Sequence, residues 1–175
     1  MENVRYVELL GIVFTIIVGS LLHFTFELSG DNSFVALFSA VNESTWEHLK
    51  LLFFPYMLYT IFEYFYFGNA YPNFITAKCI GVLCGLILIP IMFYAYTHIL
   101  GTNYFVLDIA IFLLSVLVSY LVSCSILTRG YPQMNTLCAL VLTAIAMAFF
   151  VFTFYPPKCF LFLDPVTNSY SSRAL

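Results

Sequence analysis

The run Leu9–Leu22, LLGIVFTIIVGSLL, decides the fold class of this chain. It follows Arg5 and lies inside a longer stretch, from Glu8 to Glu27, with no Asp, Glu, Lys or Arg between its ends. A helix needs about 20 mainly apolar residues to cross roughly 30 Å of hydrocarbon. A secretory signal peptide would end at a small-residue cleavage site, which this stretch does not show. We therefore expect a retained membrane-spanning helix over approximately 7–26.

Composition extends this prediction to the whole chain. Of its 175 residues, 62% are hydrophobic and 9% are charged, whereas a soluble domain carries about 25% charged residues. Further apolar stretches of spanning length follow at approximately 46–67, 77–97, 104–127 and 137–155. The sequence predicts an all-α integral membrane bundle of five transmembrane helices in one domain, 1–175, with a short C-terminal tail at 156–175. Its direct partner is the lipid bilayer, and a net charge of −3 gives no nucleic-acid-binding footprint.

A short apolar stretch, Phe34–Phe38, lies between the first two predicted spans. It is too short to cross a bilayer, so we expect a re-entrant or interfacial segment near 33–40, and six spans if this segment enters deeply. Pro55 and Pro90 fall inside the second and third spans. Each removes a backbone hydrogen bond and therefore predicts a kink.

The densest polar stretch, Asn42–Lys50, NESTWEHLK, begins the second span. Ser44 and Glu47 have the spacing of a capping box, in which the serine hydroxyl accepts from the backbone N–H three residues later and the glutamate reaches back. Lys50 in the first helical turn opposes the helix dipole. We therefore expect Lys50 to pair with Glu43 or Glu47.

Alternating the predicted spans across the bilayer places most ionisable residues at one membrane face. Ionisable groups at membrane depth are costly, so they usually pair with one another or line a site or pathway. The residues assigned to this face are His23, Glu27, Asp31, Glu43, Glu47, His48, Lys50, His98, Asp108 and Asp164. Asn42 adds a polar side chain to the same face, and this cluster is the candidate site.

The cluster contains the side chains that a divalent metal site needs. Its candidate ligands are three histidines and two glutamates: His23, His48, His98, Glu27 and Glu43. Three protein ligands and one open position suit a catalytic zinc ion, which lowers the pKa of a bound water to about 7. Asp108 and Glu47 are the candidate catalytic residues. The corresponding function is hydrolysis of a lipid-like substrate.

Two other functions fit the same sequence. The first is a small transporter or transport subunit, in which the cluster forms the vestibule. Glu63, at the opposite face, would then lie at the far end of a proton or ion route. Such a transporter would need a membrane partner or a homo-oligomer. In a structural or assembly protein, the polar groups only hold helix ends and loops in place. The stripe Ser115, Ser119 and Ser123 fits a wet path or, more simply, a close helix-packing face. The sequence leaves open whether the protein is an enzyme.

Basic residues give the expected orientation. Arg5, Lys78 and Arg129 flank spans on one side, and Lys50 and Lys158 lie on the other. Cytoplasmic loops carry more Lys and Arg than outer loops. We therefore expect the N-terminus inside, the C-terminus outside and the cluster facing outward.

Two motifs resemble a known family. Asn42–Pro55, followed by Glu63–Phe65, and the tail Asp164–Tyr170 are similar to a family of small uncharacterised bacterial polytopic membrane proteins with an NES-x-WEHLK motif. In that family a glycine often stands where Asn168 or Ser171 stands here. The resemblance covers most of the chain. It implies a multi-pass protein of the bacterial cytoplasmic membrane, without an established activity.

A looser resemblance concerns residue types alone. Three histidines, an aspartate and serines in a helical membrane bundle are similar to the zinc-dependent membrane hydrolases related to alkaline ceramidases. Those proteins have more spans, and their serine, histidine and aspartate motifs have no match here. The resemblance is an analogy and implies no site residue.

Overall fold

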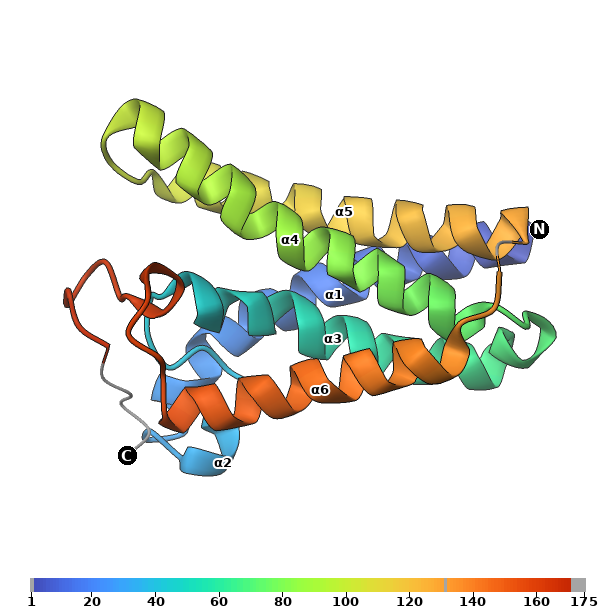
Figure 1. The fold of residues 1–175 in the computed structure, drawn as a ribbon, viewed down its shortest axis with the longest axis horizontal. Helices are drawn as coiled ribbons and strands as arrows, with labels where there is room; N and C mark the ends of the chain where they lie inside the picture. Colours follow the sequence, from blue (N-terminus) through green and yellow to red (C-terminus); the bar gives the residue numbers. More distant parts are fainter. Residues whose placement is uncertain (1, 131, 171–175) are drawn as a thin grey trace.

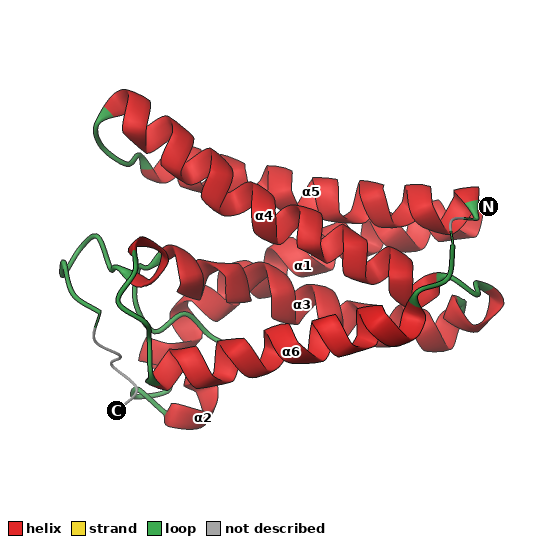
Figure 2. Ribbon diagram, viewed as in Figure 1, coloured by secondary structure: helices red, strands yellow, loops and turns green. Residues whose placement is uncertain are grey.

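The computed structural model describes residues 2–130 and 132–170, which form helices joined by loops (Figure 2). The helices are α1 (Glu2–Leu28), α2 (Ser33–Ala36), α3 (Thr45–Tyr66), α4 (Phe74–Leu100), α5 (Phe105–Arg129) and α6 (Asn135–Phe154), with 3₁₀ turns η1 (Gly68–Ala70) and η2 (Phe160–Phe162). The described ranges contain no strand, only an isolated β-bridge between Asp164 and Ser169. The long helices run along the long axis of the molecule (Figure 1). The predicted all-α class is confirmed.

Helices α1, α4, α5 and α6 are long and apolar enough to span a membrane, and their outer faces expose large apolar side chains. The candidate spans are Val4–Leu28, Phe74–Leu100, Phe105–Arg129 and Asn135–Phe154. Leu21 on α1 and Leu140 on α6 are more than half exposed. A surface this apolar fits contact with lipid rather than with water. The helix α3 is not among these four, so a fifth crossing stays a prediction.

Helix α3 contributes much of the core. It packs against α1 and α4, and Leu52 and Tyr56 on it are fully buried. The ring of Tyr56 meets that of Tyr120 on α5, with centroids 4.7 Å apart. Helices α3 and α4 both continue through their internal prolines, Pro55 and Pro90.

Helices α4 and α5 approach closely through small residues. Ser115, Ser119 and Ser123 on α5 are fully buried and face Gly81 and Gly85 on α4. A Cβ on Gly81 would lie 2.5 Å from the Ser119 carbonyl oxygen, and one on Gly85 would overlap the Ser119 hydroxyl. Small residues let membrane helices pack at short range. The serine stripe is therefore a packing face, the simpler of its two interpretations.

A buried ion pair between Glu47 and Lys50 anchors the segment that follows α1. The charged atoms of the pair lie 2.5 Å apart. Lys50 Nζ also donates to the Ala36 carbonyl at 2.8 Å and to the Thr153 hydroxyl at 2.9 Å. Glu47 Oε2 accepts from the Val41 backbone N–H at 3.1 Å. One ion pair thus ties α2, the following loop and α6 to the start of α3.

The capping box at the start of α3 forms only in part. The Ser44 hydroxyl accepts from the Glu47 backbone N–H at 3.4 Å, as predicted. The expectation that Glu47 reaches back to the Ser44 N–H is wrong, because Lys50 and the Val41 N–H hold its carboxylate. Asn42 Oδ1 accepts from the Ser44 N–H instead, at 3.0 Å. Of the two partners expected for Lys50, the structure shows Glu47.

Candidate metal centre

Helix α1 stops and α3 starts at the same end of the bundle (Figure 1). Three side chains meet there. His23 lies near the end of α1, Glu43 lies in the loop before α3, and His48 lies in the first turn of α3. His23 Nε2 is 3.3 Å from His48 Nε2. Glu43 Oε2 is 3.4 Å from His48 Nε2 and 3.8 Å from His23 Nε2. The side chains of His23, His48 and Glu43 are 29%, 32% and 46% exposed, so the group is open to a ligand.

The spacing of these three atoms fits one metal ion. Ligand atoms bound at about 2.0–2.1 Å to a tetrahedral zinc ion lie about 3.3 Å from one another. The observed separations of 3.3, 3.4 and 3.8 Å are near this value. Within the described part of the chain, His23, Glu43 and His48 form the group that could hold a metal ion.

A backbone carbonyl orients His48. The Nδ1 atom of His48 lies 2.9 Å from the Ser44 carbonyl oxygen. A carbonyl oxygen can only accept, so Nδ1 carries the proton, and in the neutral imidazole Nε2 has a free lone pair. Metal-binding histidines usually make such a bond through their other ring nitrogen, because it fixes the tautomer and the ring orientation. His48 is therefore prepared for a cation at Nε2.

The three side chains open onto a cavity of about 510 Å³. Helices α1, α3, α4 and α5 contribute to its wall, together with the tail. The wall is mostly apolar and includes Leu51, Ile89, Phe93, Phe112 and Val166. An apolar cavity of this size with a few placed polar groups is the usual form of a small-molecule site.

Asp108 lines the same cavity, and Tyr96 holds it in place. The Tyr96 hydroxyl donates to Asp108 Oδ1 and accepts from the Tyr104 backbone N–H at 3.2 Å. Asp108 is near enough to His48 for their charges to interact. The structure thus brings a carboxylate and the candidate metal ligands to one cavity.

The C-terminal tail folds back to form part of this cavity through Pro165 and Val166. Asp164 holds the turn, because its carboxylate accepts from the Val166 backbone N–H at 2.9 Å and from the Thr167 hydroxyl at 2.7 Å. The Asp164 N–H donates to the Ser169 carbonyl at 3.0 Å. Asp164 therefore shapes the wall of the cavity through the tail.

The turn in the tail places Asn168 in the left-handed region, with a φ of 51°. Glycine adopts this region without a steric cost, and asparagine tolerates it better than most residues. This conformation is consistent with the glycine that the sequence resemblance leads us to expect at this position. Ser171, the other position compared there, lies outside the described residues.

The other predicted site residues at this face lie outside the group. His98 is exposed in the last turn of α4, and Glu27 is exposed near the end of α1. Glu47 and Lys50 pair with each other in the interior, and Asn42 binds a backbone N–H. These contacts give Glu47, Lys50 and Asn42 structural roles.

Two lysines used for the orientation argument are internal. Lys50 and Lys78 are both fully buried, and Lys78 contacts Glu63 and Glu8 at the end of the bundle opposite the metal group. The expectation that Lys78 is a flanking loop charge is wrong, because it pairs with buried carboxylates. Lys50 forms the internal ion pair expected for it, so it does not count toward the orientation.

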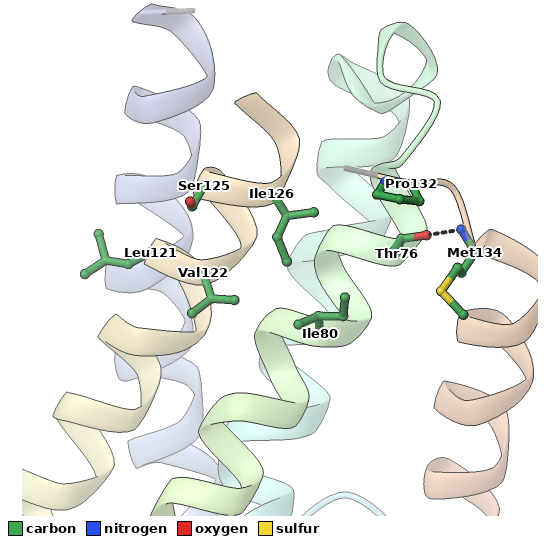
Figure 3. A pocket seen from close by; sticks show the side chains of 8 residues that line it. All are labelled: Thr76, Ile80, Leu121, Val122, Ser125, Ile126, Pro132 and Met134. Carbon is green, nitrogen blue, oxygen red and sulfur yellow. Dashed lines mark hydrogen bonds between the residues drawn. The ribbon is translucent and has the colours of Figure 1, made fainter. Parts of the chain in front are cut away.

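A second hollow, of about 530 Å³, lies between α4, α5 and the residues leading into α6 (Figure 3). The Thr76 hydroxyl accepts there from the Met134 backbone N–H at 2.8 Å. The lining residues are Thr76, Ile80, Leu121, Val122, Ser125, Ile126, Pro132 and Met134. The described residues of this lining include no acid, histidine or thiol.

Sequence reasoning missed Tyr96 and the two tail residues, Pro165 and Val166. Tyr96 is one of 13 tyrosines in the chain, and no spacing distinguishes it. The tail residues reach the cavity only because the chain folds back after α6. No local sequence signal identifies these three residues as parts of the site.

These features define a helical, membrane-type protein with a histidine and carboxylate site at one end of its bundle. Comparison with known protein families matches residues 1–172 to DUF6512, a family of unknown function, and the chain belongs to this family. Comparisons with curated proteins and with solved structures gave no match. The function of this family is unknown, so the function must be inferred from the site.

Proposed function

We propose that the protein binds a zinc ion through His23, His48 and Glu43 and uses it to hydrolyse an ester or amide bond in a lipid-like substrate. The observation that carries the proposal is the set of three ligand atoms separated by 3.3–3.8 Å. Two imidazoles and one carboxylate form a ligand set found in zinc hydrolases. Nitrogen ligands favour zinc over magnesium or calcium, which prefer oxygen.

The partial exposure of His23, Glu43 and His48 supports a catalytic role for the metal ion rather than a purely structural one. A zinc ion held by His23, Glu43 and His48 would have room for a water molecule and would make that water acidic enough to ionise near neutral pH. The cavity of about 510 Å³ provides space for a substrate beside that position.

Asp108 has the chemistry of the general base and acid in this scheme. The attacking water gives a proton to Asp108, its oxygen bonds to the carbonyl carbon, and the carbon–oxygen or carbon–nitrogen bond of the substrate breaks. Asp108 then returns the proton to the leaving alcohol or amine. The hydrogen bond from Tyr96 fixes the carboxylate while this happens.

The wall of the cavity supports a lipid-like substrate. It is mostly apolar, as an acyl chain requires. The bilayer that the apolar helices suggest would supply such a molecule directly.

The proposal also includes a location and an orientation in the membrane. We place the protein in the bacterial cytoplasmic membrane with five crossings, α3 included. Because Lys50 and Lys78 are buried, the exposed basic residues that flank the spans in the described part of the chain are Arg5 and Arg129 at one end and Lys158 at the other. From this excess of positive charge we infer that the N-terminus lies inside and the site outside.

Hydrolysis by zinc-loaded protein in mixed micelles tests the proposal, with phospholipids, acylglycerols and N-acyl lipids as substrates. We expect fatty-acid release that a chelator abolishes and zinc restores. His48→Ala should abolish turnover, and Asp108→Asn should lower it by about 10²–10⁴-fold, the usual contribution of a general base. His98→Ala is the matched control, because His98 is exposed and lies outside the group.

Folded, zinc-loaded protein that turns over none of these lipid classes would contradict the hydrolase proposal. Zinc-dependent flux of a solute into vesicles would then support the transport alternative, with the cavity as its vestibule.

A further inference from the structure

A second charged cluster lies at the end of the bundle where α1 and α4 begin and α3 ends (Figure 1). Lys78 Nζ donates to Glu8 Oε1 at 2.9 Å and lies 2.5 Å from Glu63 Oε2. Each of the three side chains comes from a different helix. Lys78 and Glu63 are fully buried, and Glu8 is 3% exposed. The cluster is therefore shielded by protein from both water and lipid.

The charges of this cluster do not balance. Two carboxylates contact one ammonium, so the fully ionised set has one negative charge in excess. A buried charge is costly unless it is paired, because the protein interior solvates it far less well than water does.

Three carboxylate oxygens of the cluster lack a hydrogen-bond partner within residues 2–130 and 132–170: Glu8 Oε2, Glu63 Oε1 and Glu63 Oε2, all inaccessible to solvent. Glu63 Oε2 still has the ion-pair contact with Lys78 Nζ, which leaves Glu8 Oε2 and Glu63 Oε1. Buried polar atoms in proteins nearly always have a partner. These two oxygens are where a bound proton would form a carboxylic O–H group.

The Tyr56 hydroxyl, on a fully buried side chain near the cluster, also has no hydrogen-bond partner among the described residues. The Tyr56 hydroxyl lies next to Ser123, because a Cβ built on Gly81 would be 2.7 Å from that hydroxyl and 3.1 Å from Ser123 Cβ. Ser123 itself donates to Glu8 Oε1 at 3.0 Å. Hydroxyl groups can donate or accept, so they can adjust to a proton on either carboxyl.

Neighbouring titratable groups do not correct the imbalance. The titratable groups near enough to feel the charges of the cluster include Tyr56, Tyr59, Tyr120 and Cys124, and Arg5 acts on Cys124 as well. Arg5 is exposed on α1, and the tyrosines and the cysteine add no positive charge. The remaining contacts of Lys78 Nζ are with aromatic rings, at 5.4–5.7 Å from the centroids of Tyr56, Phe74 and Tyr120. Lys78 is thus the only cation in contact with the carboxylates in the described part of the chain.

We propose that Glu8, Lys78 and Glu63 form a proton-binding site that holds one exchangeable proton, shared between the two carboxyls, at neutral pH. The proton cancels the excess charge and gives the unpartnered oxygens a donor. This site lies at the opposite end of the bundle from the metal group and does not depend on the proposed hydrolase function.

Infrared spectroscopy of the purified protein tests the proposal through the number of protonated carboxyls. The protein is held in a maltoside detergent, which has no ester carbonyl, and its carboxylic carbonyl stretch is identified by its shift in D₂O. The number of protons bound by the cluster should equal the number of its carboxyl groups minus the number of its lysines. We expect one in the wild type, none in Glu63→Gln or Glu8→Gln, two in Lys78→Met and one in Glu63→Gln/Lys78→Met.

The double variant removes one carboxylate and the lysine together, so it keeps the test valid if Lys78→Met alone does not fold. Glu27→Gln is the control and should leave the spectrum unchanged, because Glu27 is exposed. A wild type without an exchangeable carboxylic signal, or a signal that survives both Glu8→Gln and Glu63→Gln, would overturn the proposal. A signal that appears only when choline replaces sodium would overturn it as well, because sodium would then be the neutralising ion.

Discussion

His23 and His48 are 25 positions apart in the chain, yet their Nε2 atoms face each other at 3.3 Å. Because the Ser44 carbonyl fixes the proton of His48 on Nδ1, the two rings can share at most one hydrogen bond through these nitrogens. A metal ion held by the pair would accept both lone pairs at once and would bind Glu43 as well. The facing pair is thus the feature around which the proposed function is built.

Tyr96→Phe should lower hydrolysis while leaving zinc binding unchanged. The change removes the hydroxyl that holds Asp108 but touches no metal ligand. We expect a loss of about 10–100-fold in turnover, the usual effect of removing a partner that orients a functional group. Tyr104→Phe is the control, since Tyr104 contributes its backbone N–H to this network and keeps it. Equal losses in both variants would show that Tyr96 does not position Asp108.

Lys50→Met should destabilise the protein strongly. Removing the lysine leaves Glu47 as an unpaired buried carboxylate, at a cost of about 3–5 kcal/mol. Thermal unfolding in detergent measures the change, and Glu47→Gln/Lys50→Met should recover part of it because neither residue is then charged. Lys158→Met should have no effect, since Lys158 is exposed. A double variant no more stable than Lys50→Met would contradict the ion-pair explanation.

Gly85→Ala should also destabilise the protein, by separating α4 from α5. The added Cβ would overlap the Ser119 hydroxyl and lie 2.9 Å from the Ser115 carbonyl oxygen. Overpacking of this kind costs about 1–3 kcal/mol. Adding Ser119→Ala should return part of the lost stability, because it removes the nearest clashing atom. Unchanged thermal unfolding of Gly85→Ala would argue against the close approach of these helices.

Zinc affinity should fall as the pH is lowered. Each imidazole must be neutral to bind a metal ion, so protons compete with zinc at His23 and His48. Zinc titrations at several pH values measure the effect, and His98→Ala should show the same dependence as the wild type. A pH-independent affinity would exclude histidine ligands.

The sequence was sufficient to predict the helices and to predict that most polar residues lie at one end of the bundle. Apolar length alone predicts a helical membrane bundle, and alternation of the spans predicts which helix ends meet. Alternation does not give the rotation of a helix about its axis. Nor does it give the path of the loop that brings Glu43 to His23 and His48, or show that His98 and Glu27, expected at the same face, lie outside the group.

The buried charges were harder to predict than the exposed ones. Lys78 stands near a predicted helix end, where a lysine usually faces water. Only the packing of α1, α3 and α4 places Glu8 and Glu63 against it. The same is true of Lys50, whose contacts with Ala36 and Thr153 depend on how α2 and α6 fold against α3.

The most direct test of the metal centre is the zinc content of detergent-purified protein after incubation with zinc and removal of the excess. The wild type should retain one zinc ion per chain, and so should His98→Ala and Glu27→Gln, which change residues outside the group. His23→Ala and His48→Ala should lose the ion while remaining folded, and Glu43→Gln should weaken its binding. A folded wild type that retains no zinc, or a zinc content that depends on His98 and not on His23 and His48, would contradict the metal centre.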